Sequence, residues 1–157
     1  METTLITTEL AMAVAISALG LFQLVLAAIE YRRVHGVHYA NTARDKASAK
    51  PDSPLLGRLS RAQANLMETA PYFIGICMII AVTGTSTVAT QVAAGIFVAA
   101  RIVYFPLYAL GVPYLRGLVW MVSFVALCVM VGAVAMAIDW VAAAGPAAEW
   151  VKALQGA

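Results

Sequence analysis

The segment LAMAVAISALGLFQLVLAAI, residues 10–29, contains no charged residue, and only Ser17 and Gln23 interrupt it with polar side chains. As an α-helix, twenty residues cover about 30 Å, which is the thickness of the hydrocarbon core of a bilayer. The preceding residues include Glu2 and Glu9 but no basic cluster, and the apolar run is longer than the core of a typical signal peptide. The segment therefore predicts a membrane-spanning helix of the mature protein.

The rest of the chain repeats this apolar character. Residues 69–100 carry no charge but are too long for one crossing, and the cluster TGTST at 83–87 favours a turn between two helices. Residues 117–138 form another uncharged run, and 62% of the 157 residues are hydrophobic while 11% are charged, which argues against a soluble domain. We predict an all-α integral membrane protein of one domain over 1–157, a four-transmembrane-helix bundle with spans at about 8–31, 61–83, 88–110 and 116–139 and a loop at 32–60.

Basic residues indicate how the chain crosses the membrane. Seven of the ten Lys and Arg residues lie in or beside the first loop: Arg32, Arg33, Arg44, Lys46, Lys50, Arg58 and Arg61. Under the positive-inside rule this loop is cytoplasmic, as is the third connection, GVPYLRG, which carries Arg116, so both termini are predicted outside. Most of the loop cations, apart from Arg32 and Arg33, are expected to contact lipid headgroups and to determine the topology. The net charge of +2 comes without interleaved basic and aromatic residues, so no nucleic-acid partner is predicted.

Neither the cysteines nor the histidines predict a metal site or a disulfide framework. Cys77 and Cys128 fall within predicted spans, where we expect buried, inert thiols that pack as small apolar side chains. His35 and His38 are three residues apart and lack a third metal ligand nearby, so we expect them to be solvated loop residues.

Two groups of polar residues lie within or beside the predicted spans. In RAQANLMETAPYF, residues 61–73, the side chains of Arg61, Asn65 and Glu68 fall within an arc of about 60° on a helix. On the third span Arg101, Tyr104 and Tyr108 fall within a similar arc. Because ionisable groups in a span are costly, they are expected to face the bundle interior or an aqueous cavity. Gln63 lies nearly opposite the first group and is expected to face a different helix, including one of another subunit.

A proline lies beside the residues of each polar group. Pro71 removes the helical hydrogen bond to the carbonyl of Met67, and Pro106 does the same for Ile102. Irregular helix at membrane depth is tolerated where neighbouring groups or a cavity satisfy the backbone.

The polar residues allow two interpretations. In the first, Glu68 pairs with Arg101, and Asn65 and the tyrosines bridge helices as polar contacts. In the second they form a pocket, because the cytoplasmic half has more arginines than acids. The arginines are Arg32, Arg33, Arg61, Arg101 and Arg116, and the acids are Glu30 and Glu68. Such a pocket suits a small zwitterion with carboxylates and an ammonium group, such as an amino-acid-like or peptide ligand.

The motif Arg-x-Gln-x-Asn-x-x-Glu-x-x-Pro at 61–71, with Arg-x-x-Tyr-x-x-x-Tyr at 101–108, resembles the MAPEG family of membrane-associated proteins in eicosanoid and glutathione metabolism. This family includes microsomal glutathione transferases and the leukotriene-conjugating synthase. The resemblance covers all four spans. It implies a homotrimer that binds glutathione, the co-substrate, in a cleft between subunits open to the cytoplasm, beside a lipid-facing groove for a hydrophobic electrophilic substrate.

The resemblance also implies roles for individual residues. The tripeptide would be held by Arg61, Asn65, Glu68, Tyr104 and Tyr108, with Gln63 contributed by the neighbouring subunit. Arg101 belongs to the same polar group and joins the predicted binding residues. Arg32 and Arg33 resemble family arginines of which one can reach a glutathione carboxylate. Arg116 resembles the arginine that faces the glutathione sulfur and is the predicted catalytic residue, although Arg32 or Arg33 could reach the sulfur instead.

The sequence departs from one branch of the family. Gly117 and Trp120 stand where the prostaglandin-isomerising branch has a serine and a tyrosine, and Ala64 replaces a basic residue of that branch; Thr69 stands where some members have an aromatic residue. We therefore predict a membrane-bound transferase that conjugates glutathione to hydrophobic electrophiles or reduces lipid hydroperoxides. The alternatives are a non-catalytic scaffold that presents lipid, and an accessory subunit of a larger membrane complex.

Overall fold

The computed structural model describes residues 6–140 apart from positions 46, 47 and 49, together with residues 142, 145 and 150. Its helices are α1 (Thr8–His35), α2 (Val37–Ala40), α3 (Pro54–Thr83), α4 (Val88–Leu110) and α5 (Leu115–Ala137). Four of them, α1, α3, α4 and α5, are long and apolar enough to cross a membrane. The predicted all-α fold with four spans is confirmed, and the chain is a multi-pass integral membrane protein.

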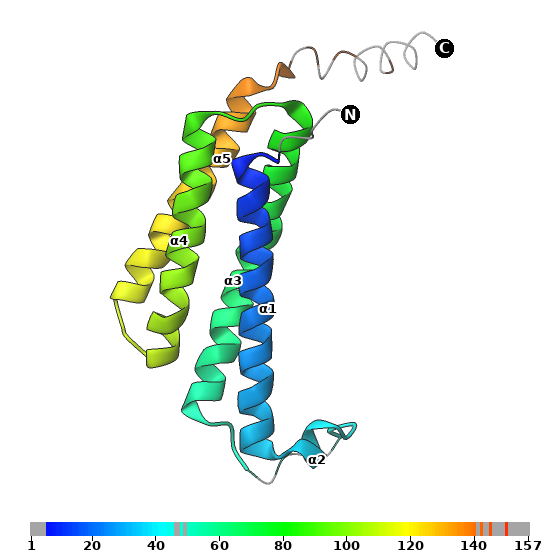
Figure 1. The fold of residues 1–157 in the computed structure, drawn as a ribbon, viewed down its shortest axis with the longest axis vertical. Coiled ribbons are helices and arrows are strands. Elements are labelled where there is room, and N and C mark those ends of the chain that lie inside the picture. The colour runs from blue at the N-terminus through cyan, green and yellow to red at the C-terminus, as the bar shows by residue number, and fades with distance from the viewer. Residues whose placement is uncertain are drawn as a thin grey trace.

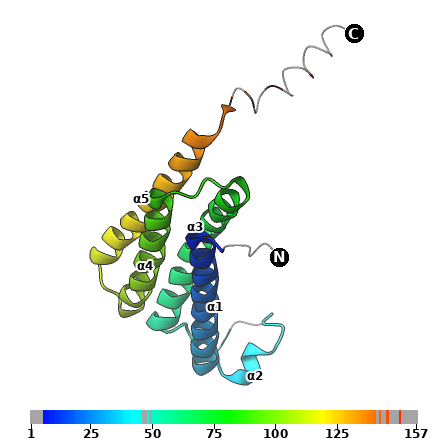
Figure 2. The same cartoon turned by 45° about the horizontal axis from the view of Figure 1, so that its top comes forward.

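The four long helices alternate in direction and form two close pairs, α1 with α3 and α4 with α5 (Figure 1). Helix α1 also packs on α4, whereas α5 lies against α4 on the side away from α1 (Figure 2). The start of α1, the turn between α3 and α4 and the end of α5 lie at one end of the bundle, here called the turn end. Helix α2 and the connection between α4 and α5 lie at the other end, here called the α2 end.

Helix α1 is longer than predicted, and so is α3 at its start. The first span was expected to stop at residue 31, but α1 continues to His35 and ends at Gly36, whose φ of 85° favours glycine. Helix α3 begins at Pro54 rather than at residue 61, because Ser53 caps it: the Leu56 N–H donates to Ser53 Oγ at 3.0 Å. The connection between the two spans is therefore shorter than 32–60, and it contains the one-turn helix α2.

The predicted bounds 88–110 and 116–139 agree with α4 and α5 to within two residues. Helix α4 starts with a capping box between Thr87 and Thr90 and ends at Gly111, whose φ is 77°. Pro71 and Pro106 lie inside α3 and α4, and both helices continue through them.

The larger of the apolar clusters among the described residues fills the half of the bundle nearer the turn end, and a smaller one around Leu59, Ala62 and Phe105 lies toward the α2 end. At the centre of the larger cluster the rings of Phe73 and Phe97 stack with their centroids 4.1 Å apart, which joins α3 to α4. Cys77 is fully buried here, as predicted, but Cys128 is exposed on α5. The prediction was wrong for Cys128 because its position turns toward the outside of the bundle.

A buried carboxylate fastens the turn end. Glu9, at the start of α1, has no exposed surface and accepts hydrogen bonds from Thr90 Oγ1 at 2.6 Å and from Ser86 Oγ at 2.9 and 3.2 Å. These contacts tie α1 to the turn between α3 and α4. We call Glu9, Ser86 and Thr90 the Glu9 clasp.

Two further contacts fasten the connection at the α2 end. Glu30 binds Arg33 through two hydrogen bonds, of 2.6 and 2.8 Å, and accepts a third from Ser53 Oγ at 2.8 Å. His35 Nδ1 lies 2.7 Å from Ser48 Oγ, and its Nε2 lies 2.8 Å from Asp52 Oδ1. Only 3% of the His35 side chain is exposed, so the expectation of a solvated histidine was wrong. The loop folds over the end of α1, which the sequence pattern did not indicate.

Candidate functional site

The polar residues of α3 and α4 meet at Arg101. This arginine is 1% exposed on α4, and its Nη1 donates a hydrogen bond of 2.7 Å to Oδ1 of Asn65 on α3. The guanidinium carbon lies 5.3 Å from the ring centroid of Phe97 and 5.7 Å from that of Tyr104, within the range of cation–π contacts. Arg101 is thus held by an amide on one helix and by aromatic rings on its own helix.

Asn65 stands between Arg101 and Glu68. Its Nδ2 lies 3.5 Å from Glu68 Oε2, which is the outer limit of a hydrogen bond. Among the described residues Arg101 forms no ion pair with Glu68, so the direct pair of the first interpretation is not found. The neutral amide of Asn65 takes the place of that pair.

Two nitrogens of Arg101 lack a hydrogen-bond partner. Nε and Nη2 are buried, and neither donates to any acceptor in the described part of the chain. A buried charge is costly unless it is paired and hydrogen-bonded. The centre of the site therefore carries a positive charge that a nearby anion would stabilise.

The contacts continue from Arg101 toward the α2 end. The rings of Tyr104 and Tyr108 lie 5.5 Å apart, and the guanidinium carbon of Arg116 lies 4.7 Å from the centroid of Tyr108. Residues of α3, α4 and α5 thus form one contact series, here called the polar ladder. It consists of Asn65, Glu68, Arg101, Tyr104, Tyr108 and Arg116.

Arg61 and Gln63 lie outside the contacts of the ladder. Arg61 is on the ladder face of α3, but its side chain lies against Gly57. The approach is so close that a Cβ added at Gly57 would be 3.3 Å from Arg61 Nη1. Gln63 is half-buried and lies about 200° around α3 from Arg61. The expectation that Gln63 faces another direction agrees with this helix geometry.

Arg32 and Arg33 also lie apart from the ladder. Arg33 is engaged by Glu30, and the side chain of Arg32 is exposed and forms no hydrogen bond or ion pair with any described residue. Arg32 instead lines a hollow beside Tyr31 and Arg44. Of the ten predicted site residues, the structure brings together six, and Arg32, Arg33, Arg61 and Gln63 remain separate.

An apolar groove begins at the ladder and runs between α3 and α5. It has a volume of about 600 Å³, and it starts at Glu68 and Thr69. We call it the α3–α5 groove. Its remaining lining residues are Tyr72, Trp120, Phe124, Leu127, Cys128, Val131 and Gly132. The indole N–H of Trp120 is buried without an acceptor among the described residues, and the Trp120 and Phe124 rings stack at 5.3 Å.

Sequence reasoning missed several residues of this region. It did not place Tyr72 or Phe124 at the site, although Tyr72 follows Glu68 by four residues and therefore shares its helix face. It also missed Phe97, which precedes Arg101 by the same interval and lies beneath its guanidinium. The four-residue spacing is a signal that could have indicated both Tyr72 and Phe97.

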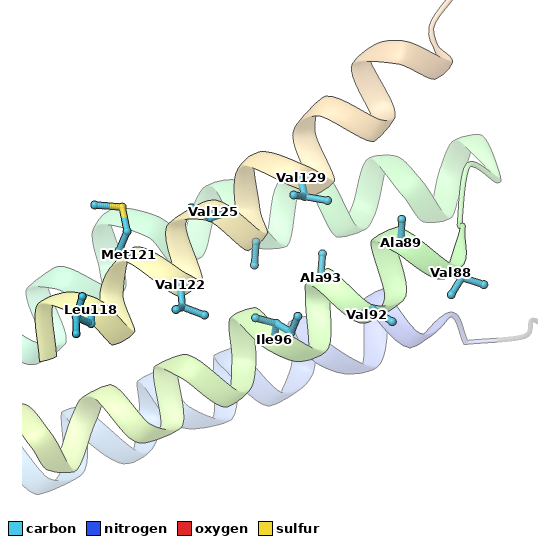
Figure 3. A pocket seen from close by; sticks show the side chains of 11 residues that line it. Val88, Ala89, Val92, Ala93, Ile96, Leu118, Met121, Val122, Val125 and Val129 are labelled. Carbon is cyan, nitrogen blue, oxygen red and sulfur yellow. The ribbon is translucent and has the colours of Figure 1, made fainter. Parts of the chain in front are cut away.

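A larger hollow between α4 and α5 has a different character. It has a volume of about 770 Å³ and is lined entirely by apolar side chains. Figure 3 shows Ala93, Ile96 and Val122 pointing into the space between the two helices. Without a polar or ionisable group, this hollow offers nothing to orient or activate a reacting molecule.

Comparison with known proteins gives the family. Searches of curated proteins and of solved structures give no significant match. A model of the MAPEG family matches residues 10–136, which include every residue of the polar ladder and of the α3–α5 groove. Because this match covers most of the chain, the protein belongs to the MAPEG family, whose members are membrane proteins of eicosanoid and glutathione metabolism.

Proposed function

We propose that this protein is a glutathione-dependent membrane transferase that joins the glutathione thiol to hydrophobic electrophiles. The observation that carries the proposal is the buried guanidinium of Arg101, two of whose nitrogens have no acceptor among the described residues. Family membership supports a role in glutathione or eicosanoid metabolism in general. The charge and position of the ladder support glutathione as the co-substrate.

The ladder offers groups that complement glutathione. The tripeptide carries two carboxylates and one ammonium group, and arginine binds carboxylates through strong charge-assisted hydrogen bonds. Arg61 and Arg101 suit the carboxylates, and the exposed carboxylate of Glu68 suits the ammonium group. Asn65, Tyr104 and Tyr108 add neutral hydrogen-bonding groups along the peptide.

Arg116 is the proposed catalytic residue. The pKa of a cysteine thiol is about 8.5, so only a few per cent is thiolate at neutral pH. The thiolate is the nucleophile. A nearby guanidinium stabilises the thiolate, and the position of Arg116 over Tyr108 supports a sulfur at that end of the ladder. In the reaction the sulfur forms a bond to the electrophilic carbon, the leaving group departs with its electron pair, and the thiol proton passes to solvent.

The α3–α5 groove is the proposed site of the hydrophobic substrate. It shares Glu68 with the ladder and continues along apolar residues of α5, so a bound electrophile would lie next to the tripeptide. The same arrangement suits reduction of a lipid hydroperoxide: two glutathione molecules are oxidised to the disulfide, and the hydroperoxide is reduced to an alcohol and water.

We further propose a homotrimer whose sites are shared between copies. Arg32 and Gln63 lie away from the ladder of their own chain, and a neighbouring copy could bring such surfaces to it. The concentration of arginines at the α2 end supports a cytoplasmic location for this end. The first and third connections would then be cytoplasmic and both termini outside; Lys46 and Lys152 lie outside the described residues.

Activity of the purified protein tests the proposal. The detergent-solubilised protein is incubated with glutathione and a nitro-activated aryl chloride, and the thioether is quantified by chromatography. We expect product that scales with protein and falls sharply in Glu68→Gln. A lipid-presenting scaffold or an accessory subunit would produce no thioether above the uncatalysed rate, and that result would reject the enzyme in favour of one of these alternatives.

A further inference from the structure

A second positively charged hollow lies at the α2 end, between α1, the segment after α2 and the start of α3. It has a volume of about 240 Å³. Its charged residues are Arg32 and Arg44, and its wall includes Leu24, Ala28 and Tyr31. We call it the arginine groove. It shares no lining residue with the polar ladder or with the α3–α5 groove.

Arg44 is held in place over the groove. Its guanidinium carbon lies 4.8 Å from the ring centroid of Tyr31, and its Nη2 donates a hydrogen bond of 2.9 Å to the carbonyl of Ala40. Its φ is 61°, in the left-handed region that side chains with a Cβ rarely adopt. The left-handed backbone conformation of Arg44 is unfavourable. The contacts of its guanidinium with Tyr31 and Ala40 offset this cost and hold the cation at the groove.

The two arginines of the groove are not neutralised by an acid that lines it. The carboxylate of Glu30 binds Arg33 and Ser53, and the guanidinium of Arg32 has no partner among the described residues. Asp45 lines a different hollow, beside His38 and Tyr39. The arginine groove therefore attracts an anion.

The wall of the groove continues into the lipid-facing surface of α1. Leu24 is 50% exposed, and Leu21, one turn farther from the charged end, is 65% exposed. An occupant that fits both parts has an anionic head and an apolar tail. Basic pockets at the membrane boundary bind acidic lipid headgroups for this reason.

We propose that the arginine groove binds the headgroup of an anionic phospholipid. The phosphate lies between Arg32 and Arg44, and one acyl chain follows Leu24 and Leu21 toward the turn end. Arg32 is also a candidate glutathione contact of a neighbouring copy, whereas Arg44 is not, so variants of Arg44 test the lipid site separately from the transferase proposal.

The lipid site is tested by native mass spectrometry. The full chain is released from nanodiscs of equal parts phosphatidylcholine and phosphatidylglycerol, and the lipids that remain bound are identified. We expect preferential retention of phosphatidylglycerol. Arg44→Gln should lower that retention about fivefold, since one arginine near an anionic surface has an effect of that size. Arg44→Gly should do the same while relieving the backbone strain, because glycine accepts positive φ. Lys50→Gln removes an equal charge from the same connection but does not line the groove, so it should retain the lipid as the wild type does.

Three results would overturn the proposal. The first is equal retention of both lipids by the wild type. The second is an equal loss in Lys50→Gln and in the Arg44 variants, which would indicate only general charge attraction. The third is displacement of the retained phosphatidylglycerol by millimolar glutathione, which would assign the groove to the tripeptide. Melting temperatures near that of the wild type would show that the variants are folded.

Discussion

The guanidinium of Arg101 binds the amide oxygen of Asn65 at 2.7 Å, and Asn65 in turn separates Arg101 from Glu68. A direct arginine–glutamate pair would neutralise both charges. With the amide between them, both keep much of their capacity to bind a ligand of opposite charge. The position of Asn65 thus supports a binding site more than a purely structural contact between α3 and α4.

Replacing Asn65 should destabilise the bundle. Asn65→Leu removes the hydrogen bond to a buried charge, and such bonds contribute about 1.5–3 kcal/mol to the free energy of unfolding. Denaturant titration in detergent should show a loss of this size. Ala64→Leu, an exposed change at the adjacent position, is the control and should change little. An unchanged midpoint for Asn65→Leu would mean that the amide does not hold Arg101.

Glutathione should stabilise the folded protein. At a concentration about a hundredfold above its dissociation constant, a ligand that binds only the native state adds roughly 2.7 kcal/mol. Melting curves should therefore shift upward with glutathione, and the shift should shrink in Glu68→Gln if Glu68 binds the ammonium group. If millimolar glutathione leaves the melting temperature unchanged and Glu68→Gln binds it as tightly as the wild type, the assignment of the ladder is wrong.

Arg116→Ala should change the pH dependence of turnover. Without the guanidinium, the pKa of the bound thiol should rise toward about 8.5, and each unit of that rise corresponds to about 1.4 kcal/mol. We expect near-normal glutathione affinity, a large loss of kcat near neutral pH and partial recovery as the pH rises. Thiolate absorbance of bound glutathione gives an independent measure.

The competing role for Arg116 is to mark the cytoplasmic edge of the membrane. In that case kcat and the thiolate absorbance would both match the wild type at every pH. Arg116→Lys is the matched control: it retains a cation at the same position and should retain part of the activity at neutral pH.

Mixed oligomers should reveal a shared site. If Gln63 acts on the ligand of a neighbouring copy, chains with Gln63→Ala and chains with Tyr104→Phe are each impaired alone. Co-expression should then produce some intact sites and restore part of the activity. A native mass equal to one chain, or no recovery in the mixture, would contradict the trimer with shared sites.

The Glu9 clasp should contribute to stability without affecting catalysis. Glu9→Leu removes the carboxylate that accepts from both hydroxyls, but Thr90 Oγ1 still has the carbonyl of Thr87 at 2.9 Å and Ser86 is only half-buried. We therefore expect a loss near the lower end of the about 1–3 kcal/mol that a buried unsatisfied group costs. Glu9→Gln keeps one acceptor oxygen and should be milder. Because the clasp is at the turn end, the kcat of folded protein should be unchanged in both variants. A fall in kcat without a loss of stability would show that the clasp affects the site.

The spans were predictable because membrane helices have a strong compositional signal. The ends of α1 and α3 were less predictable for a physical reason. The boundary had been set by charge, at Arg32 and Arg61, whereas the helices end where backbone geometry and capping require it. Gly36 and the pair Ser53–Pro54 carry that information in the sequence.

The two polar faces of the site could also be predicted, since helical spacing places their residues on one side of each helix. Which residues of the two faces contact each other could not be predicted, because this depends on the relative position of α3 and α4 along their axes. Asn65 rather than Glu68 binds Arg101 for this reason. The errors at His35 and Cys128 have a related origin: the first depends on how the loop folds, and the second on which face of α5 is turned outward.

The hydroxyl of Ser53 allows the connection between α1 and α3 to vary in length without loss of the fold. It accepts from the first turn of α3 and donates to Glu30, so α1 and α3 are joined directly where the loop leaves and returns. The loop is thereby closed at its base, and lengthening a flexible loop is cheap: each doubling costs only about 0.6 kcal/mol. Insertions or affinity tags in this connection, placed after Arg44, should therefore leave the fold intact, and relatives should differ most in length here.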